Sequence, residues 1–396
     1  MMWQVRVWLQ LDGEACHAGD IVCERGADGR SFGAFRYSAA YLRSNTAVAL
    51  DPLHLPLRDG EFVVAHPGVP SVFIDSLPDD WGRRLLVRRH GIGRGERHPA
   101  RLLLALAGSG LGALLYSSGD GVPVRCGSAD CIHLDKLLAA AEKFEQGDVV
   151  DDEIAVLLAA GSSPGGARPK AVVIDRHSGI DYLAKFPSRK DDVDVVRIEA
   201  ATMNLARRAG LDVPPCTLLE SCAKPVLLVR RFDVSAAGRR HMISMQTLLD
   251  AQEYYVCRYT DMANILRRVA HAPHLEVARL FRQMVFNAII NNTDDHLKNF
   301  WMIYDREQGW RLSPAFDLLP NVGRNREHVL FFATDPLYPG HMGLAKIGAE
   351  WGVANSAEIV AQVVEALSDW RVDFLRFGVA EEQLRQFDEI DTHLLN

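Results

Sequence analysis

The sequence predicts an α+β fold, in which a mixed α/β N-terminal part precedes a mainly helical C-terminal part. Two patterns carry this prediction. Up to residue 231, short apolar runs typical of strands are separated by single helical stretches. From residue 260 onward, apolar residues recur every three or four positions, as they do on one face of a helix. With 396 residues, the chain is long enough for two or three domains.

The composition is that of a folded protein in a reducing compartment. The hydrophobic fraction is 48% and the charged fraction 24%, and the net charge of −7 excludes nucleic-acid binding through bulk charge. Seven scattered cysteines do not form a disulfide scaffold. The start of the chain lacks the basic and apolar regions of a signal peptide, and the most apolar window, 102–116, is shorter than the ~20 residues of a membrane span. We therefore expect a cytoplasmic protein that does not contact the membrane.

The elements of the N-terminal half follow from local signals. Alternation predicts strands over 5–11 and 33–37, and the run 102–116 predicts a buried helix, a glycine turn and a strand. A helix should begin near Pro78-Asp79-Asp80 and end at Arg88-Arg89-His90, because acids favour its start and bases its end. A linker over 118–132 and helices over 133–145 and 151–160 should follow.

The rest of the chain alternates strands with one helix and then becomes helical. A glycine-rich loop, 161–166, precedes predicted strands at 170–175, 181–186, 213–219 and 225–231. Asp194 near the start and Gly210 at the end bound a helix over 194–209. The clearest helix is 274–291, followed by a hairpin of 300–304 and 310–312 and by helices over 340–396. The predicted domains are 1–120, 133–250 and 251–396.

Three polar clusters stand out as candidates for chemistry. The densest is Asn291-Asn-Thr-Asp-Asp-His-Leu-Lys-Asn299, where the strongest helix ends and the hairpin begins. The second is Ser313-Pro-Ala-Phe-Asp-Leu-Leu-Pro320, just after the hairpin. The third combines the glycine-rich loop with Arg168, Lys170 and Lys185. Such residues are costly to bury without partners, which favours a functional interpretation.

The spacing of the acidic and amide residues favours phosphoryl transfer. Asn299 follows Asp294 by five positions, and Asp317 comes after the hairpin. Protein kinases use this layout. The first Asp accepts or orients the proton of the substrate hydroxyl, while the Asn and the second Asp offer the oxygen ligands that Mg²⁺ prefers. Asp295 stands at the wrong distance from Asn299, and we interpret it as a solvating or capping residue.

The upstream residues complete the kinase order. Lys185 lies in a predicted strand, and Glu199, early in the next helix, is its natural ion-pair partner. Glycines in the loop let backbone N–H groups approach phosphates. The literal motifs His-Arg-Asp, Asp-Phe-Gly and Ala-Pro-Glu are absent, and Ala167 stands where a Walker A loop requires lysine.

These residues, taken together, match a known family. The matching motifs are Phe35-Arg-Tyr37, Phe73-Ile-Asp-Ser-Leu-Pro78, Gly165-Gly-Ala-Arg-Pro-Lys170, Leu183-Ala-Lys-Phe-Pro187, Val229-Arg-Arg-Phe-Asp233, Asn292-Thr-Asp-Asp-His-Leu-Lys-Asn299 and Leu312-Ser-Pro-Ala-Phe-Asp-Leu-Leu-Pro320. The sequence resembles the HipA family of bacterial Ser/Thr protein kinases, the toxins of HipBA toxin–antitoxin modules. The resemblance covers nearly the whole chain and implies a protein-kinase-like bilobal fold of HipA type.

The resemblance also implies roles for individual residues. Asp294 would be the catalytic aspartate, braced by Asn292 and His296, and Asn299 and Asp317 would hold Mg²⁺. The residues expected to bind ATP are Gly165, Gly166, Lys170, Lys185, Glu199, Arg230, Phe232 and Phe316. Arg230 stands where the family often has an acidic hinge residue. Ser163, or its neighbour Ser162, would be autophosphorylated, which in the family ejects the glycine loop and switches the enzyme off.

The implied partners are a protein substrate related to translation, such as an aminoacyl-tRNA synthetase, and a helix-turn-helix antitoxin like HipB, through which alone DNA would be contacted.

Three alternatives stay open. The chain could be a catalytically impaired kinase fold that serves as an antitoxin-binding co-repressor. It could be a small-molecule phosphotransferase, although Asn292 stands where such enzymes usually have His. It could be a metal hydrolase built on Asp294, Asp295 and His296, which would leave Lys185 without a role.

Overall fold

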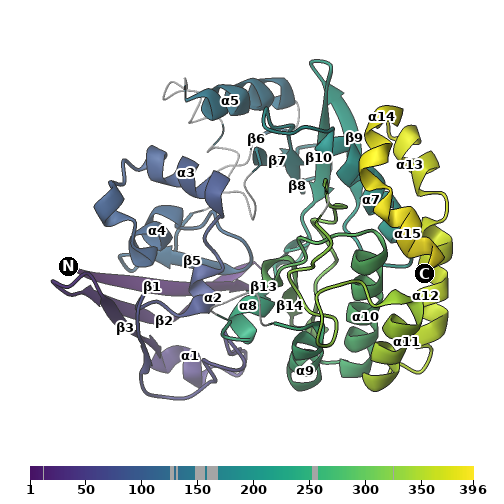
Figure 1. Cartoon of the computed structure of the whole chain (residues 1–396). Helices are drawn as coiled ribbons and strands as arrows, with labels where there is room; N and C mark the ends of the chain where they lie inside the picture. Colours follow the sequence, from purple (N-terminus) through teal and green to yellow (C-terminus); the bar gives the residue numbers. More distant parts are fainter. Residues whose placement is uncertain are drawn as a thin grey trace. The chain divides into compact units, whose positions relative to one another are not determined.

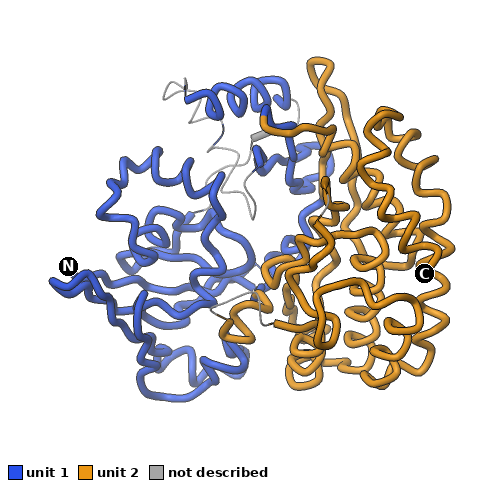
Figure 2. The backbone as a smooth tube through the Cα atoms, in the orientation of Figure 1, with its two compact units in different colours: residues 1–189, 230–243 blue, residues 190–229, 244–396 orange. Residues whose placement is uncertain are grey.

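The computed structural model describes residues 1–11, 13–124, 129–130, 133–147, 157, 168–251, 257–323 and 325–396. These residues form two compact units, which Figure 2 shows in different colours. Unit 1 comprises Met1–Arg189 and Arg230–Ile243, and unit 2 comprises Lys190–Val229 and Ser244–Asn396. The middle segment expected from the sequence, 133–250, therefore contributes to both units.

Unit 1 begins with an antiparallel five-stranded sheet in the order β4-β3-β2-β1-β5 (Figure 1). The strand predicted over 5–11 lies within β1 of this sheet, and its residues Val5 and Val7 are fully buried. Helix α4 packs on β1. The predicted helix near 80–90 and the predicted helix, turn and strand of 102–116 are confirmed. The bounds are β1 Met2–Leu11, β2 Glu14–Arg25, β3 Ser31–Tyr37, β4 Phe62–Val64, α3 Asp80–Arg89, α4 Pro99–Leu106 and β5 Leu114–Ser117.

The second part of unit 1 carries the predicted phosphate-binding lysines. Strand β7 (Lys170–Asp175) pairs antiparallel with β8 (Ile180–Lys185), and α5 (Leu134–Gln146) confirms the helix expected over 133–145. The indole Nε1 of Trp81, in α3, donates a hydrogen bond of 3.1 Å to the carbonyl oxygen of Lys170. This hydrogen bond attaches the start of β7 to α3.

One prediction in this region is wrong, and two fall outside the described residues. The expected linker 118–132 contains a short strand, β6 (Ala129–Asp130), which pairs in parallel with β7. The pairing partner lies more than 40 residues away, at Val173 and Ile174, so the local composition gave no sign of it. The helix expected over 151–160, apart from residue 157, and the glycine loop 161–166 lie outside the described residues.

Unit 2 is mainly helical, as expected. Its longest helix, α10 (Pro273–Ile289), starts with proline at a position where no N–H is needed. Its predicted apolar stripe, which includes Leu280, Met284 and Ala288, is fully buried. The other bounds are α7 Val195–Arg208, β9 Cys216–Ser221, β10 Lys224–Arg230, α8 Met245–Leu248, α9 Tyr259–Val269, α11 Gly340–Glu350, α12 Ser356–Leu367, α13 Trp370–Arg376, α14 Glu381–Leu384 and α15 Glu389–Leu395.

A small hairpin follows α10, where the sequence predicted one. Strand β14 (Trp301–Asp305) pairs antiparallel with β15 (Gly309–Leu312). Gly309 is the first residue of β15 rather than a residue between the strands, and its φ of +62° lies in the region that favours glycine. No helix among the described residues has the length and apolar character that a membrane span requires.

Candidate active site

The densest polar cluster forms the loop between α10 and the hairpin. The chain leaves the helix through Asn291, whose φ of +57° is a left-handed conformation that asparagine tolerates better than most residues. Asn292 then folds back onto the helix. Its N–H donates to the Asn287 carbonyl at 2.9 Å, and its side-chain Nδ2 donates to Asn287 Oδ1 at 3.1 Å. Asn292 thus ties the start of the loop to the last turn of α10.

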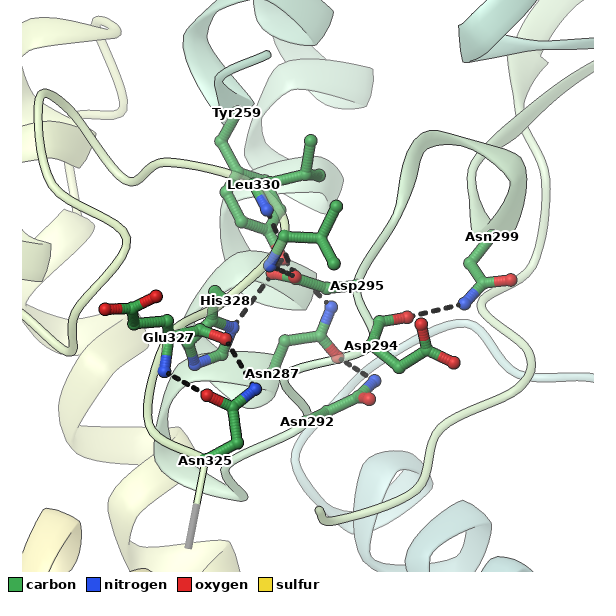
Figure 3. Close-up of polar contacts among 11 residues, drawn as sticks. Tyr259, Asn287, Asn292, Asp294, Asp295, Asn299, Asn325, Glu327, His328 and Leu330 are labelled. Carbon is green, nitrogen blue, oxygen red and sulfur yellow. Dashed lines mark hydrogen bonds and ion pairs between the residues drawn. The ribbon is translucent and has the colours of Figure 1, made fainter. Parts of the chain in front are cut away.

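Asp294 points its carboxylate out of this loop. Its side chain is 81% exposed, and the nearer imidazole nitrogen of His296, Nε2, lies 3.7 Å from Oδ1. The backbone of Asp294 is held from the other side, because Asn299 Nδ2 donates to the Asp294 carbonyl at 2.9 Å (Figure 3). The five-residue spacing recognised in the sequence is therefore the spacing that closes this short loop. An exposed carboxylate on a fixed backbone can receive a proton from a bound hydroxyl.

The segment that carries Asp317 is attached to the same loop. The N–H of Asn321 donates to the Asn291 carbonyl at 2.8 Å, and the N–H of Ser313 donates to the Trp301 carbonyl at 2.8 Å. Asp317 has a φ of +56°, a conformation that costs free energy for a residue with a side chain and that occurs preferentially at functional sites. Residues 291–299 and 313–321 are therefore joined within unit 2.

The two predicted metal ligands have suitable chemistry. The amide oxygen of Asn299 faces away from the Asp294 carbonyl in Figure 3, since its nitrogen makes that hydrogen bond. An amide oxygen and a carboxylate are the hard donors that Mg²⁺ prefers, with water and phosphate oxygens filling the remaining positions. Residues Asn299 and Asp317 thus fit a magnesium ion in the donors they offer.

Asp295 is the residue that the sequence interpretation placed least well. It does cap backbone N–H groups, but it is not solvated, because it is completely buried. Its two oxygens accept hydrogen bonds from Tyr259, His328, Val329 and Leu330. Since Asp295 faces inward and Asp294 outward, the metal-hydrolase alternative lacks its converging side chains. Among the described residues, no three His, Cys, Asp or Glu side chains form a group that could hold a metal.

The buried partners of Asp295, which Figure 3 shows around its carboxylate, were not predicted from the sequence. Asn287 carried a signal, because a buried amide on an otherwise apolar helix face requires a polar partner. His328 and Tyr259 carried none, since the segment around His328 has no periodic pattern and Tyr259 looks like an ordinary core aromatic residue.

Unit 1 supplies the predicted lysines. Lys170 and Lys185 are directly opposite each other in the β7–β8 ladder, so their side chains share one face of the sheet. Lys170 is buried and Lys185 half-buried. Two lysines at opposed positions place two positive charges on one face of this strand pair.

The remaining predicted residues are distributed over both units. Arg230 is exposed and Phe232 half-buried, at the start of the segment that returns to unit 1. That segment is anchored in unit 1 by the buried Asp233 carboxylate, which pairs with Arg231 and accepts a hydrogen bond from the Gly112 N–H at 2.9 Å. In unit 2, Glu199 is buried in α7 and Phe316 is half-buried beside Asp317. Ser162, Ser163, Gly165 and Gly166 lie outside the described residues.

Comparison with family models assigns the chain. A model described as the HipA-like C-terminal domain matches residues 162–370, and one described as the HipA N-terminal domain matches residues 16–117. The first match alone covers more than half of the 396 residues. The chain belongs to the HipA family. The predicted family and the predicted fold class are thereby confirmed.

Curated relatives of this HipA-family chain bear kinase names. It is 27% identical to the candidate kinase Y4mE of Sinorhizobium fredii over 317 residues, covering 73% of this chain and 72% of the relative. It is 26% identical to the candidate kinase Y4dM of the same organism over 321 residues, covering 74% and 73%. Among solved structures, it is similar to HipA in a complex of HipA, HipB and operator DNA from Shewanella oneidensis MR-1. The TM-score is 0.72 at 15% identity, over 99% of this chain and 96% of that one, which shows the fold.

Proposed function

We propose that this chain is an ATP- and Mg²⁺-dependent serine/threonine protein kinase and the toxin of a type II toxin–antitoxin system. The observation that carries the proposal is the geometry of the Asp294 loop. The Asp294 carboxylate is exposed, and its own carbonyl is fixed by the side chain of Asn299. A positioned base next to a metal-binding amide is the minimal catalytic equipment of a protein kinase.

In the proposed reaction, a serine or threonine oxygen of the substrate attacks the γ-phosphorus of ATP. The new P–O bond forms as the bond to the β-phosphate oxygen breaks, and the hydroxyl proton passes to Asp294. Magnesium, held by Asn299 and Asp317, would neutralise charge on the phosphates. Lys170 and Lys185 would bind the phosphate chain from the β7–β8 face. The glycine loop at Gly165 and Gly166 would supply backbone N–H groups, and Arg230, Phe232 and Phe316 would lie beside the adenine.

The proposal includes partners and regulation. A HipB-like helix-turn-helix antitoxin would bind the chain and would alone contact DNA. The HipA of Shewanella oneidensis, which shares the fold, was solved with HipB and operator DNA, and this supports the proposal. The substrate would be a cytoplasmic protein of translation, such as an aminoacyl-tRNA synthetase. Phosphorylation of Ser163 or Ser162 would add about −2 charge beside the ATP phosphates and so disfavour ATP binding.

Autophosphorylation tests this function without a known substrate. The purified full chain is incubated with Mg²⁺ and γ-labelled ATP, and the modified peptides are located by mass spectrometry. We expect one phosphate, on Ser163 or Ser162, and weaker ATP binding by the modified chain. The Ser162→Ala and Ser163→Ala variants distinguish the two sites. Phosphate found only outside residues 161–166, or unchanged ATP affinity after modification, would contradict the proposed regulation.

The same experiment separates the alternatives. A chain that binds Mg·ATP but transfers no phosphate to itself, or to proteins of a translation extract, would be the impaired kinase fold that serves as a co-repressor. Transfer to a small molecule, with no labelled protein, would favour the small-molecule phosphotransferase. The exposed carboxylate at Asp294 favours the protein kinase over the impaired fold, because a base that solvent reaches can also receive the hydroxyl proton of a substrate.

A further inference from the structure

Two neighbouring carboxylates in the catalytic loop have opposite environments. The Asp294 side chain is 81% exposed, whereas Asp295 is completely buried. Burying a carboxylate is unfavourable unless hydrogen-bond donors replace the lost water. The hydrogen-bond partners of Asp295 therefore show which segments of the chain its buried carboxylate connects.

Hydrogen-bond donors surround the Asp295 carboxylate (Figure 3). Its Oδ2 accepts from the Tyr259 hydroxyl at 2.6 Å and lies 2.9 Å from His328 Nδ1. Its Oδ1 accepts from the backbone N–H groups of Val329 at 2.9 Å and Leu330 at 3.3 Å. Because a carboxylate only accepts, the Nδ1 atom of His328 must carry its proton in this contact. Burial and the Asp295 charge raise the pKa of Tyr259 well above its ordinary value, so this hydroxyl stays a donor.

The hydrogen bonds continue from Asp295 back to the start of its own loop. Asn292 donates to Asn287, Asn287 Nδ2 donates to the Tyr259 hydroxyl at 3.1 Å, and Tyr259 donates to Asp295. Asn287 and Tyr259 each accept one hydrogen bond and donate another, and the series ends on the Asp295 carboxylate. Donors and acceptors aligned in this way reinforce one another in a buried site. These hydrogen bonds thus connect Asn292 with Asp295, in the same loop, through one side chain of α10 and one of α9.

We propose that Asp295 is a positioning residue, whose buried carboxylate holds the Asp294 backbone and the segment 328–330 in the catalytic arrangement. This inference rests on the proposed kinase function. Asp295 cannot turn outward without taking the acceptor away from the Tyr259 hydroxyl, His328 Nδ1 and the Leu330 N–H, so the adjoining peptide is held while the Asp294 side chain faces solvent. Asn299 fixes the same residue from the other side, through the Asp294 carbonyl.

Asparagine at position 295 cannot replace the carboxylate. With its oxygen toward Val329 and Leu330, its NH₂ group faces the Tyr259 hydroxyl, whose proton then has no acceptor. With the amide turned around, the same NH₂ group faces the two backbone N–H groups. Either orientation leaves at least one buried donor unpaired, so the loop must shift although the size of the side chain is unchanged.

The chain offers a matched control in unit 1. Asp51 is also buried, and one of its oxygens accepts from the backbone N–H groups of Leu53 and His54, at 2.9 and 3.0 Å. Its other oxygen lies 2.9 Å from His54 Nδ1. Asp51→Asn therefore disturbs the same kind of contact as Asp295→Asn, but outside the catalytic loop.

The test compares the full-length wild type with Asp295→Asn, Asp51→Asn and the milder Tyr259→Phe, which removes one of the four donors. Three quantities are measured: the rate of autophosphorylation at saturating Mg·ATP, the ATP concentration that gives half this rate, and hydrogen exchange at the amides of Val329 and Leu330. For Asp295→Asn we expect a rate about 100-fold lower, as for a misplaced catalytic group, with less than about a threefold change in half-saturating ATP. Exchange at the two amides should accelerate.

The controls decide between positioning and general stability. Asp51→Asn should unfold at a lower temperature but keep the wild-type rate, and Tyr259→Phe should lose part of the rate. If Asp295→Asn keeps the wild-type rate while its amides exchange faster, the contact is only structural and the proposal is wrong. Unchanged exchange would contradict the hydrogen bonds on which the proposal depends. A wild-type chain that transfers no phosphate would overturn the kinase function itself, which is a separate and recognisable outcome.

Discussion

Replacing Asp294 by asparagine should remove catalysis while leaving the fold intact. The side chain is 81% exposed, and its ion-pair distance to His296 is 3.7 Å, which is long. Exposed ion pairs contribute about 0–1 kcal/mol to folding, so we expect a change in unfolding free energy within about 0.5 kcal/mol. Loss of a general base lowers a rate by about 100-fold to 10,000-fold. The two effects are therefore well separated.

The assay for Asp294→Asn combines three measurements on the full chain: autophosphorylation rate, Mg·ATP affinity by calorimetry, and urea unfolding. We expect the rate to fall into the predicted range while the affinity changes by less than about threefold, since the phosphate and metal ligands remain. Asp294→Asn also keeps the backbone carbonyl that accepts from Asn299. Wild-type turnover in a correctly folded variant would refute the assignment of Asp294 as the base. A large loss of stability would refute the picture of an exposed carboxylate.

Two further predictions concern the metal ligand and the response to acid. Asp317→Asn should weaken Mg·ATP binding about tenfold or more at unchanged stability, because asparagine tolerates the φ of +56° and only the charge is lost. Asp250→Asn, at a φ of +48°, is the matched control. Equal weakening of Mg·ATP binding in both variants would contradict the metal assignment. Burial lowers the pKa of His241 to about 4, although its Nε2 atom donates a hydrogen bond of 2.7 Å to the Leu50 carbonyl. The folded state thus binds this proton less readily than the unfolded state. The contribution of the neutral His241 to the free energy of unfolding is therefore present above pH 6.5 and is lost as the pH falls toward 4. Between pH 7.5 and 5, the wild type should lose about 2 kcal/mol more than His241→Gln in urea unfolding, and identical losses would contradict this account.

The parts of the site that depend on local sequence were predictable. Asp294 and Asn299 are five positions apart because a loop of that length lets the amide reach the carbonyl, so the spacing itself encodes the geometry. The stripe on α10 and the hairpin that follows it are local in the same sense. These signals operate over a few residues, and the structure agrees with them in unit 2.

The parts that depend on distant partners were not predictable. The donors that bury Asp295 come from Tyr259, 36 residues before it, and from His328, 33 residues after it. Strand β6 likewise forms only because β7 is there to pair with it. The left-handed backbone at Asp317 lies in a segment attached at Ser313 and Asn321, and the residue type alone does not predict it. A single sequence carries no pattern for such contacts.

The Asp-Asp pair illustrates how two identical residues acquire different roles. Neighbouring carboxylates repel, and both could not be buried at an acceptable cost in free energy. Donors supplied by α9 and by 328–330 stabilise the buried charge of Asp295, and the geometry of the chain then turns the preceding side chain toward solvent. The exposed position of Asp294 is thus a consequence of contacts that Asp294 does not make itself. If Asp294 is the base, as we propose, substitutions at Tyr259 or His328 should change its activity from within the core, whereas substitutions on the surface around Asp294 should change mainly which substrates reach it.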